Sequence, residues 1–223
     1  MEMLPQMTQQ AEIFELLNHE PGTGVSVVDR DGVTLYINSE SIRIFFGEPR
    51  TPEMVIGKNL VELGFAKEWA DERVELIRRI ERTGEECLLR TIWQGKQQFS
   101  WFRAIGDVEN GEAFRVLVVT RRVGAGEEAD LLLESELSVI KSEVAGLGDL
   151  SELTKRELEV LAMIGQGLTA KEIAALLHRS VKTVENHRIA LGNKLKKSNK
   201  VELALMARAA GLMVDDSERL RVD

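Results

Sequence analysis

Several side chains in the C-terminal third of the chain are of the types that read and hold nucleic acid. Asn186 could hydrogen-bond adenine bidentately, Glu185 could accept from the amino group of cytosine, and Ile189 could contact a thymine methyl. Lys182 and Thr183 stand at the start of the same predicted helix, where the helix dipole also favours phosphate. The residues that we expect at DNA are Lys171, Lys182, Thr183, Glu185, Asn186, His187, Ile189, Asn193, Lys194 and Lys200.

Four short helices must position these side chains, and the sequence marks where they begin. A Thr or Asn followed three residues later by Glu, the spacing of a capping box, occurs at Thr154, Thr169 and Asn199. Ser180 can cap the helix that carries the reading residues. Only about two residues separate the second helix from the third, which is typical of a helix-turn-helix. We therefore predict an all-α, four-helix DNA-binding domain over residues 151–212.

This stretch resembles the LuxR-type (GerE) DNA-binding domain over about sixty residues. The motifs that carry the resemblance include Lys171-Glu172-Ile173-Ala174, Thr183-Val184, Asn186-His187 and Lys194-Leu195. The resemblance implies a bacterial transcriptional regulator that places the helix over residues 181–195 in the major groove. A two-fold DNA site would match a homodimer.

Three residues depart from the pattern of that family. Gly192 lies inside the reading helix, where it should cost about 1 kcal/mol relative to alanine. Lys196 and Lys197 replace the usual Gly-Val turn. Glu185 occupies a position that is often basic, so the target sequences common in the family are not implied.

The net charge of −8 argues against nucleic acid only when it is averaged over the whole chain of 223 residues. Residues 151–211 contain eleven Lys and Arg against six Asp and Glu, a net charge of +5, whereas residues 123–150 contain one Lys and seven acidic residues. The basic block thus coincides with the helix-turn-helix, as the electrostatic footprint of a DNA-binding surface should.

The N-terminal part has a different pattern, which predicts an α+β domain over residues 11–122 after a tail of residues 1–10. Two strands around the Asp31-Gly32 turn precede a helical middle and three further strands, giving a five-stranded antiparallel sheet with helices. The order and the stretches GVSVVDRDG, LYIN, GKNLVEL and FRVLVVTRR resemble a PAS domain. A related small α+β sensor fold would give the same pattern.

A linker over residues 123–150 joins the two domains, and its apolar spacing predicts a coiled coil. Residues 123–129 have the composition of a hinge, and the apolar residues that follow repeat at spacings of 4, 3, 4 and 3. This seam could dimerise or could fold back on the chain's own sheet. It consists of Leu133, Leu137, Ile140, Val144 and Leu147, and a second tail is predicted over residues 213–223.

The sensor domain lacks the residues that a coloured cofactor would need. Residues 39–65 contain no cysteine for a flavin adduct, and residues 67–82 contain no histidine for haem, so we expect no cofactor and no metal. An uncoloured small molecule, with an acidic metabolite as the most specific candidate, could bind among aromatic strand residues, although such residues often form only core. The candidate pocket residues are Trp93, Trp101, Phe102 and Arg103.

Catalysis, disulfides and membrane insertion find no support in the sequence. Three histidines in separate predicted elements cannot form a catalytic group, so we do not expect an enzyme. The single cysteine, Cys87, excludes an intrachain disulfide framework. No apolar run approaches the ~20 residues that span a bilayer, and the start lacks a signal pattern, so we expect a cytoplasmic protein.

The leading interpretation is therefore a homodimeric transcriptional regulator that binds double-stranded DNA under control of a PAS-like domain. RNA polymerase is a further candidate partner. An alternative is a PAS-like interaction module with weak or no DNA binding of its own, since Glu185 and Gly192 disturb the reading helix. Another is a sigma-factor-like region, which the Asn186-His187-Arg188 run disfavours.

Overall fold

The computed structural model describes residues 15, 18–47, 50–106, 113–124 and 137–222. The chain divides into two compact units, of which the first comprises Met1–Leu89 and Phe99–Arg122, and the second Arg90–Gln98 and Val123–Asp223. The hairpin tip Arg90–Gln98 thus belongs with the C-terminal helices, although the strands that enter and leave it belong to the first unit.

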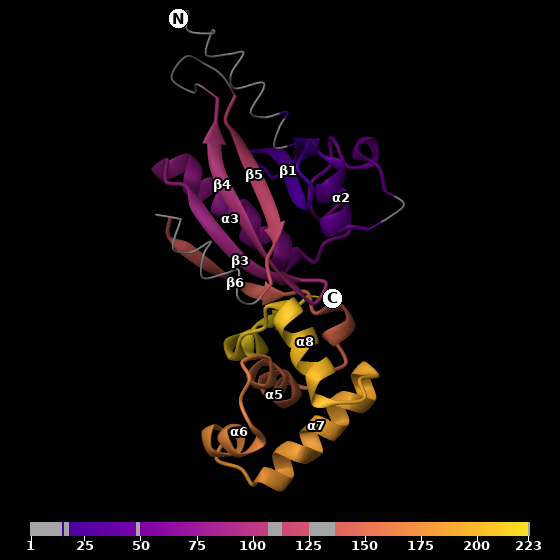
Figure 1. The fold of residues 1–223 in the computed structure, drawn as a ribbon. Helices are drawn as coiled ribbons and strands as arrows, with labels where there is room; N and C mark the ends of the chain where they lie inside the picture. The colour runs from indigo at the N-terminus through magenta and orange to yellow at the C-terminus, as the bar shows by residue number, and fades with distance from the viewer. Residues whose placement is uncertain (1–14, 16–17, 48–49, 107–112, 125–136, 223) are drawn as a thin grey trace, which may run out of the picture. The chain divides into compact units, whose positions relative to one another are not determined.

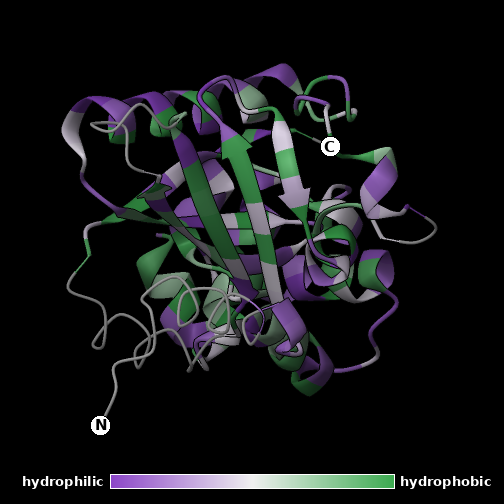
Figure 2. Cartoon of the chain, turned by 90° about the horizontal axis from the view of Figure 1, so that it is seen from above, coloured by the Kyte–Doolittle hydropathy of each residue, from purple (hydrophilic) through white to green (hydrophobic). Residues whose placement is uncertain are grey.

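Antiparallel strands form the centre of the first unit (Figure 1). β1 pairs with β2 on one side and with β5 on the other, where Val25 lies opposite Val119. Hydrophobic residues run along the central strands (Figure 2). Together with β6 (Val139–Ala145) and β7 (Leu220–Arg221), the strand order is β2-β1-β5-β4-β3-β6-β7. The bounds are β1 Thr23–Asp29, β2 Thr34–Ile37, β3 Cys87–Trp93, β4 Lys96–Ile105 and β5 Arg115–Arg122.

Helices between β2 and β3 complete the first unit. They are α2 (Ser39–Phe45), the short η1 (Pro52–Met54) and α3 (Lys67–Thr83). α3 has one buried side, on which Trp69, Leu76, Ile77 and Ile80 are at most 8% exposed. α3 ends at Gly84, whose left-handed backbone (φ 68°) favours glycine.

The second unit holds the four predicted helices and one continuous core. That core joins Ile92 of the hairpin tip to Leu147 and Leu150, and then to Leu161, Val184 and Leu203 of the helices. The elements are β6 Val139–Ala145, η3 Gly148–Leu150, α5 Lys155–Gly165, α6 Ala170–Leu176, α7 Val181–Leu195, α8 Lys200–Ala210, η4 Val214–Glu218 and β7 Leu220–Arg221.

The predicted coiled-coil helix is wrong over the part of the linker that the structure describes. Ile140 and Val144 lie on strand β6, and Leu147 follows it as a buried core residue. Leu137 is half-buried just before β6, and Leu133 lies outside the described residues. Barely two heptads cannot hold a helix without a partner, whereas the edge of a sheet offers backbone hydrogen bonds to a strand.

The C-terminal residues are also ordered rather than a tail. Residues 214–218 form η4, and Leu220 pairs in parallel with Val144 of β6. This parallel pair makes the sheet mixed, and β6 and β7 extend it beyond the five antiparallel strands that were predicted. Strand β7 has only two residues, which limits the edge that it exposes.

Candidate nucleic-acid interface

The helix starts that position the interface are the predicted ones. The Thr154 hydroxyl accepts from the Glu157 amide, and the Glu157 carboxylate accepts from the Thr154 amide at 2.7 Å. Reciprocal capping boxes also begin α6 at Thr169 and α8 at Asn199. Side-chain caps of this kind typically stabilise a helix by ~1 kcal/mol each. Short helices therefore begin at fixed residues.

A tight turn at His178 joins α6 to α7. His178 has a left-handed backbone (φ 51°), and its neighbour Arg179 donates its amide to Ala174 O at 2.9 Å. Ser180 then caps α7 by accepting from the Thr183 amide at 3.1 Å. Since α6 and α7 are linked so closely, their crossing is fixed by the packing of Ala174 and Val184, which are both buried.

Helix α7 has one buried face and one exposed face. Val184 and Leu191 are 2% and 0% exposed. On the opposite face Lys182, Asn186 and Asn193 are exposed, and 56% of Ile189 is accessible. The structure thus brings the predicted reading residues onto one face, and their contact with DNA remains a prediction.

Glu185 is held by a residue that the sequence analysis did not single out. Arg188 Nε donates to Glu185 Oε2 at 2.7 Å, and the two side chains are 35% and 40% exposed. The spacing of three residues on one helix is a known ion-pair geometry and could have indicated the contact. Arg188 therefore joins the candidate residues of this face.

Two lysines predicted to contact phosphate also have partners inside the domain. Lys194 Nζ donates to Glu157 Oε2 at 2.7 Å and to Glu152 O at 3.0 Å. Lys200 Nζ donates to Leu168 O at 3.0 Å. Burial raises the pKa of Glu157, but hydrogen bonds from Lys194 and Thr154 outweigh it, and the pKa lies below its ordinary value. Lys194 thus fastens α7 to the start of α5.

The remaining predicted DNA residues occupy the borders of the exposed face. Lys171 is exposed on α6. Thr183 is half-buried, and its hydroxyl lies 2.8 Å from Ser180 Oγ. His187 is half-buried. None of the three occupies the centre of the exposed face.

The predicted ligand residues differ in burial and in the unit to which they belong. Phe102 is buried and Trp101 half-buried on β4, but Arg103 is largely exposed and pairs with Glu86 at 3.0 Å. Trp93 belongs to the second unit, where its ring packs on Gly146. A hollow of about 440 Å³ lies elsewhere in the first unit, and it is lined by Asp31, Asn59, Leu60, Val61, Ala70, Asp71, Val74, Glu75 and Arg78.

Cys87 is 2% exposed, and burial raises the pKa of its thiol to about 11, which makes it a packing residue. Within the described ranges no three His, Cys, Asp or Glu side chains are grouped to hold a metal ion. No helix among the described residues is long and apolar enough to cross a membrane.

Comparison with known proteins assigns both parts of the chain. Residues 151–207 match the model of bacterial regulatory proteins of the luxR family. Two curated relatives are the transcriptional regulatory protein UhpA of Escherichia coli, 56% identical over 23% of this chain and 26% of that protein, and the transcriptional activator ExaE of Pseudomonas putida, 37% identical over 44% and 47%. The chain therefore spans less than half of the length of these relatives.

Two further comparisons concern the whole chain and its N-terminal part. The crystal structure of Vibrio cholera VqmA in complex with ligand and DNA is 19% identical and covers 91% of this chain and 90% of that chain, with a TM-score of 0.47. The model of the PAS fold matches residues 12–129, more than half of the chain. The chain belongs to the PAS-fold family and carries a luxR-family regulatory domain at its C-terminal end.

Proposed function

We propose that this protein is a DNA-binding transcriptional regulator in which α7 reads the major groove and the PAS-fold domain controls the binding. The observation that carries the proposal is the exposed face of α7, where Lys182, Asn186 and Ile189 stand opposite the buried Val184 and Leu191. An α-helix fits the major groove, and amide, lysine and aliphatic side chains can each contact a base edge or a phosphate there.

The regulator acts as a homodimer on a two-fold DNA site. Support comes from α8, on which Val201 and Leu205 are 66% and 63% exposed one helical turn apart. A second copy would cover this face isologously, each α8 against the other. Since the seam predicted in the linker is a strand from Val139 onward, α8 replaces it as the proposed contact.

Two further partners follow from this role, and neither is needed for the DNA contact itself. RNA polymerase is the partner through which such a regulator would act on transcription. An uncoloured small molecule in the PAS-fold domain would supply the signal. Because chromosomal DNA is the target, we place the activity in the bacterial cytoplasm.

Salt-dependent binding to duplex DNA tests the proposal. The purified chain is titrated against random-sequence duplexes at several salt concentrations, and its preferred site is then obtained by selection from a random pool. We expect the logarithm of the affinity to fall linearly with the logarithm of the salt concentration, because lysine contacts release counterions. The selected site should be an inverted repeat with half-sites about one helical turn apart.

Two variants test whether the binding to DNA depends on α7. Lys182→Gln/Asn186→Ala should weaken duplex binding, whereas Lys67→Gln, which removes one exposed charge from α3, should leave it unchanged. A chain that shifts no duplex at low salt would contradict the proposal and favour an interaction module instead.

A further inference from the structure

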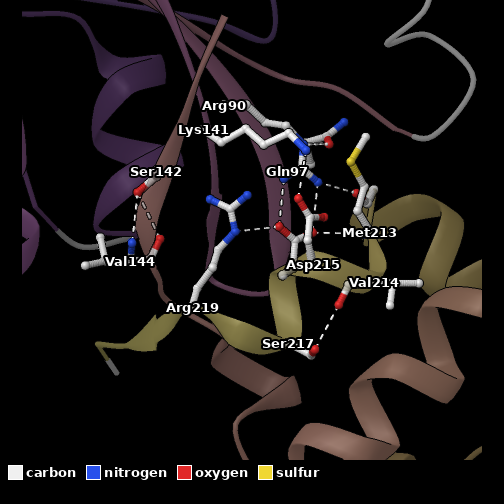
Figure 3. Close-up of polar contacts among 12 residues, drawn as sticks. Arg90, Gln97, Lys141, Ser142, Val144, Met213, Val214, Asp215, Ser217 and Arg219 are labelled. Atoms are coloured by element: carbon white, nitrogen blue, oxygen red, sulfur yellow. Dashed lines mark hydrogen bonds and ion pairs between the residues drawn. The ribbon is translucent and has the colours of Figure 1, made fainter. Parts of the chain in front are cut away.

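A buried ion pair lies between the hairpin tip and the C-terminal segment of the second unit (Figure 3). Arg90 donates to both carboxylate oxygens of Asp216, at 2.7 and 2.9 Å, and also to Gly211 O at 2.9 Å. The two side chains are 1% and 2% exposed. Burial of a charge is costly unless it is paired and hydrogen-bonded, so this geometry is strongly specified.

Neighbouring groups complete the hydrogen bonding around this pair. Gln97 Oε1 accepts from Arg90 Nε at 2.6 Å, and Gln97 Nε2 donates to Val123 O at 3.1 Å. The amide of Met213 donates to Asp216 Oδ2 at 2.8 Å. Arg219 Nε pairs with Asp216 Oδ1 at 2.8 Å. Arg90, Gln97, Asp216 and Arg219 therefore form one network, which we call the Arg90 network. It holds the β3–β4 hairpin tip to η4 and to the end of α8.

Packing around the Arg90 network leaves the hairpin tip little room to move alone. A Cβ on Gly211 would lie 2.5 Å from Gln97 Cβ, and one on Gly95 would lie 2.7 Å from Leu147 O. Close-packed elements of this kind respond to strain by shifting together. A displacement of the tip must therefore move the end of α8 or break buried contacts.

Further contacts lead from α8 to the reading helix inside the same unit. A Cβ on Gly165 of α5 would lie 2.7 Å from Ala207 Cβ, so α5 and α8 cross closely. At the other end of α5, Glu157 holds Lys194 of α7. The Arg90 network is therefore connected to α7 through two tight contacts along α5.

The strands that carry the Arg90 network continue into the PAS-fold unit. β3 passes from Leu89 of the first unit to Arg90 of the second, and β4 returns from Gln98 to Phe99. Gln98 is 1% exposed, and its side-chain amide has no hydrogen bond within the described residues. A buried amide without a hydrogen bond is unfavourable, so a rearrangement of β4 that supplies a partner lowers the free energy. β4 can therefore respond to a change in the sensor.

We propose that Arg90 is a positioning residue that couples the PAS-fold unit to the DNA-binding helices through β3 and β4. The proposal rests on the proposed function. Its physical content is linkage: if the sensor strands bias α7, then DNA bound at α7 must bias the sensor strands by the same free energy. The effect of bound DNA on the sensor strands is therefore the quantity that measures the coupling.

Hydrogen exchange of the full chain, with and without saturating random-sequence duplex, tests the coupling. The readout is the segment Phe99–Ile105, which belongs to the first unit. In the wild type we expect the duplex to slow exchange there about fivefold or more. In Arg90→Met/Asp216→Leu the slowing should disappear while duplex binding and its salt slope persist, because neither residue lies on α7. The variant also removes the partner of Arg219, which is 7% exposed, so circular dichroism checks that it folds.

A matched control removes an exposed ion pair from α3. Arg82→Gln/Glu75→Gln deletes one charge of each sign where both side chains are more than 60% exposed, and it should keep the wild-type slowing. A merely structural Arg90 network would lower protection throughout the second unit without removing the effect of the duplex on Phe99–Ile105. That split separates coupling from stability.

Each other outcome counts against the proposal. Equal slowing in wild type and Arg90→Met/Asp216→Leu overturns it, as does a wild type that binds the duplex without slowing at Phe99–Ile105. A wild type that does not bind the duplex refutes the proposed function first. Should the double variant not fold, Gln97→Met keeps the ion pair but removes the acceptor for Arg90 Nε. Full slowing in that variant would also overturn the coupling.

Discussion

A Cβ atom on Gly192 of α7 would lie 2.8 Å from the carbonyl oxygen of Lys197. The Lys197 amide donates to Gly192 O at 2.9 Å, because the chain turns back at Lys196 in a left-handed conformation (φ 53°). The sequence pattern suggested that Gly192 is a weak point of the reading helix. The structure shows instead that the return of the backbone requires glycine there.

Gly192→Ala should therefore destabilise the protein although alanine is the better helix former. Forcing a methyl group against backbone costs ~1–3 kcal/mol, which exceeds the gain of about 1 kcal/mol in helix propensity. Urea unfolding monitored by circular dichroism measures the change. Asn193→Ala, on the exposed face of the same helix, is the control and should be neutral or slightly stabilising. A higher midpoint for Gly192→Ala would contradict this account.

Lys196→Gly should have the opposite effect at the next turn. Lys196 caps α7 with φ 53° and ψ 43°, a conformation that costs a residue with a Cβ roughly 1–2 kcal/mol. Glycine removes this strain but adds freedom to the unfolded chain, so a net gain of about 0.5–1 kcal/mol is expected. Lys196→Gln removes the same charge and keeps the strain. Equal unfolding midpoints for the two variants would show that the backbone is not strained.

The parts of the fold that were predicted from the sequence are those set by neighbours in the chain. The capping boxes of Thr154, Thr169 and Asn199 each join residues three positions apart, and all of them form. The buried and exposed faces of α7 follow from its period in the same way. Local spacing therefore predicted the DNA-binding helices and the face that they present.

Contacts between distant residues could not be read from the sequence. Arg90 and Asp216 are 126 positions apart, and Lys194 finds Glu157 across 37. The apolar spacing of Ile140 and Val144 suits a helix seam, but four residues apart also place both on one face of a strand. The edge of the sheet, with which β6 pairs, decided for the strand over the helix. No residue near Ile140 and Val144 in the sequence indicates that this edge is available.

Glu157 should give the DNA-binding domain a stability that depends on pH. Hydrogen bonds from Lys194 and Thr154 outweigh burial and lower the pKa of Glu157 from its ordinary value of 4.5. A carboxylate with a lowered pKa in the folded state stabilises fully above its unfolded pKa, and the stabilisation is lost as pH falls through the folded pKa. Glu157→Gln should lower the free energy of unfolding by about 1–3 kcal/mol at neutral pH and by less in acid.

The control for this prediction is Glu68→Gln on α3, where the side chain is exposed. It should change the free energy of unfolding by less than about 0.5 kcal/mol at any pH. Chemical unfolding at a series of pH values between roughly 3 and 7 measures both variants. If the Glu157→Gln deficit were the same at every pH, the ionised form would not be the stabilising one.

Lys182 and Asn186 should affect DNA binding in different ways. Lys182→Gln should weaken binding to every duplex similarly and lower the salt slope by about 1 unit, as expected for a phosphate contact. Asn186→Ala should lose ~1–3 kcal/mol only on the selected site, because it removes a base contact. Fluorescence anisotropy with selected and random duplexes separates the two effects. Equal losses of Asn186→Ala on both duplexes would refute base reading.

Glu185 and Arg188 should act on base preference as a pair. Arg188 Nε holds Glu185 Oε2 at 2.7 Å, which orients the carboxylate on the flank of the exposed face. A carboxylate there can accept from a cytosine amino group, but it also repels phosphates. Glu185→Gln should therefore lose ~1–3 kcal/mol of preference for cytosine at one position of the selected site while it tightens binding to random duplex.

Arg188→Met tests whether the orientation of Glu185 matters. Without its partner the Glu185 carboxylate is no longer held in place, so we expect a weaker cytosine preference and weaker binding to all duplexes. The double variant Glu185→Gln/Arg188→Met completes a double-mutant cycle, in which contacting residues typically couple by 0.5–3 kcal/mol. Competition between duplexes that differ at the cytosine position supplies the four free energies. Additive effects would mean that the ion pair breaks on DNA and that each residue acts alone.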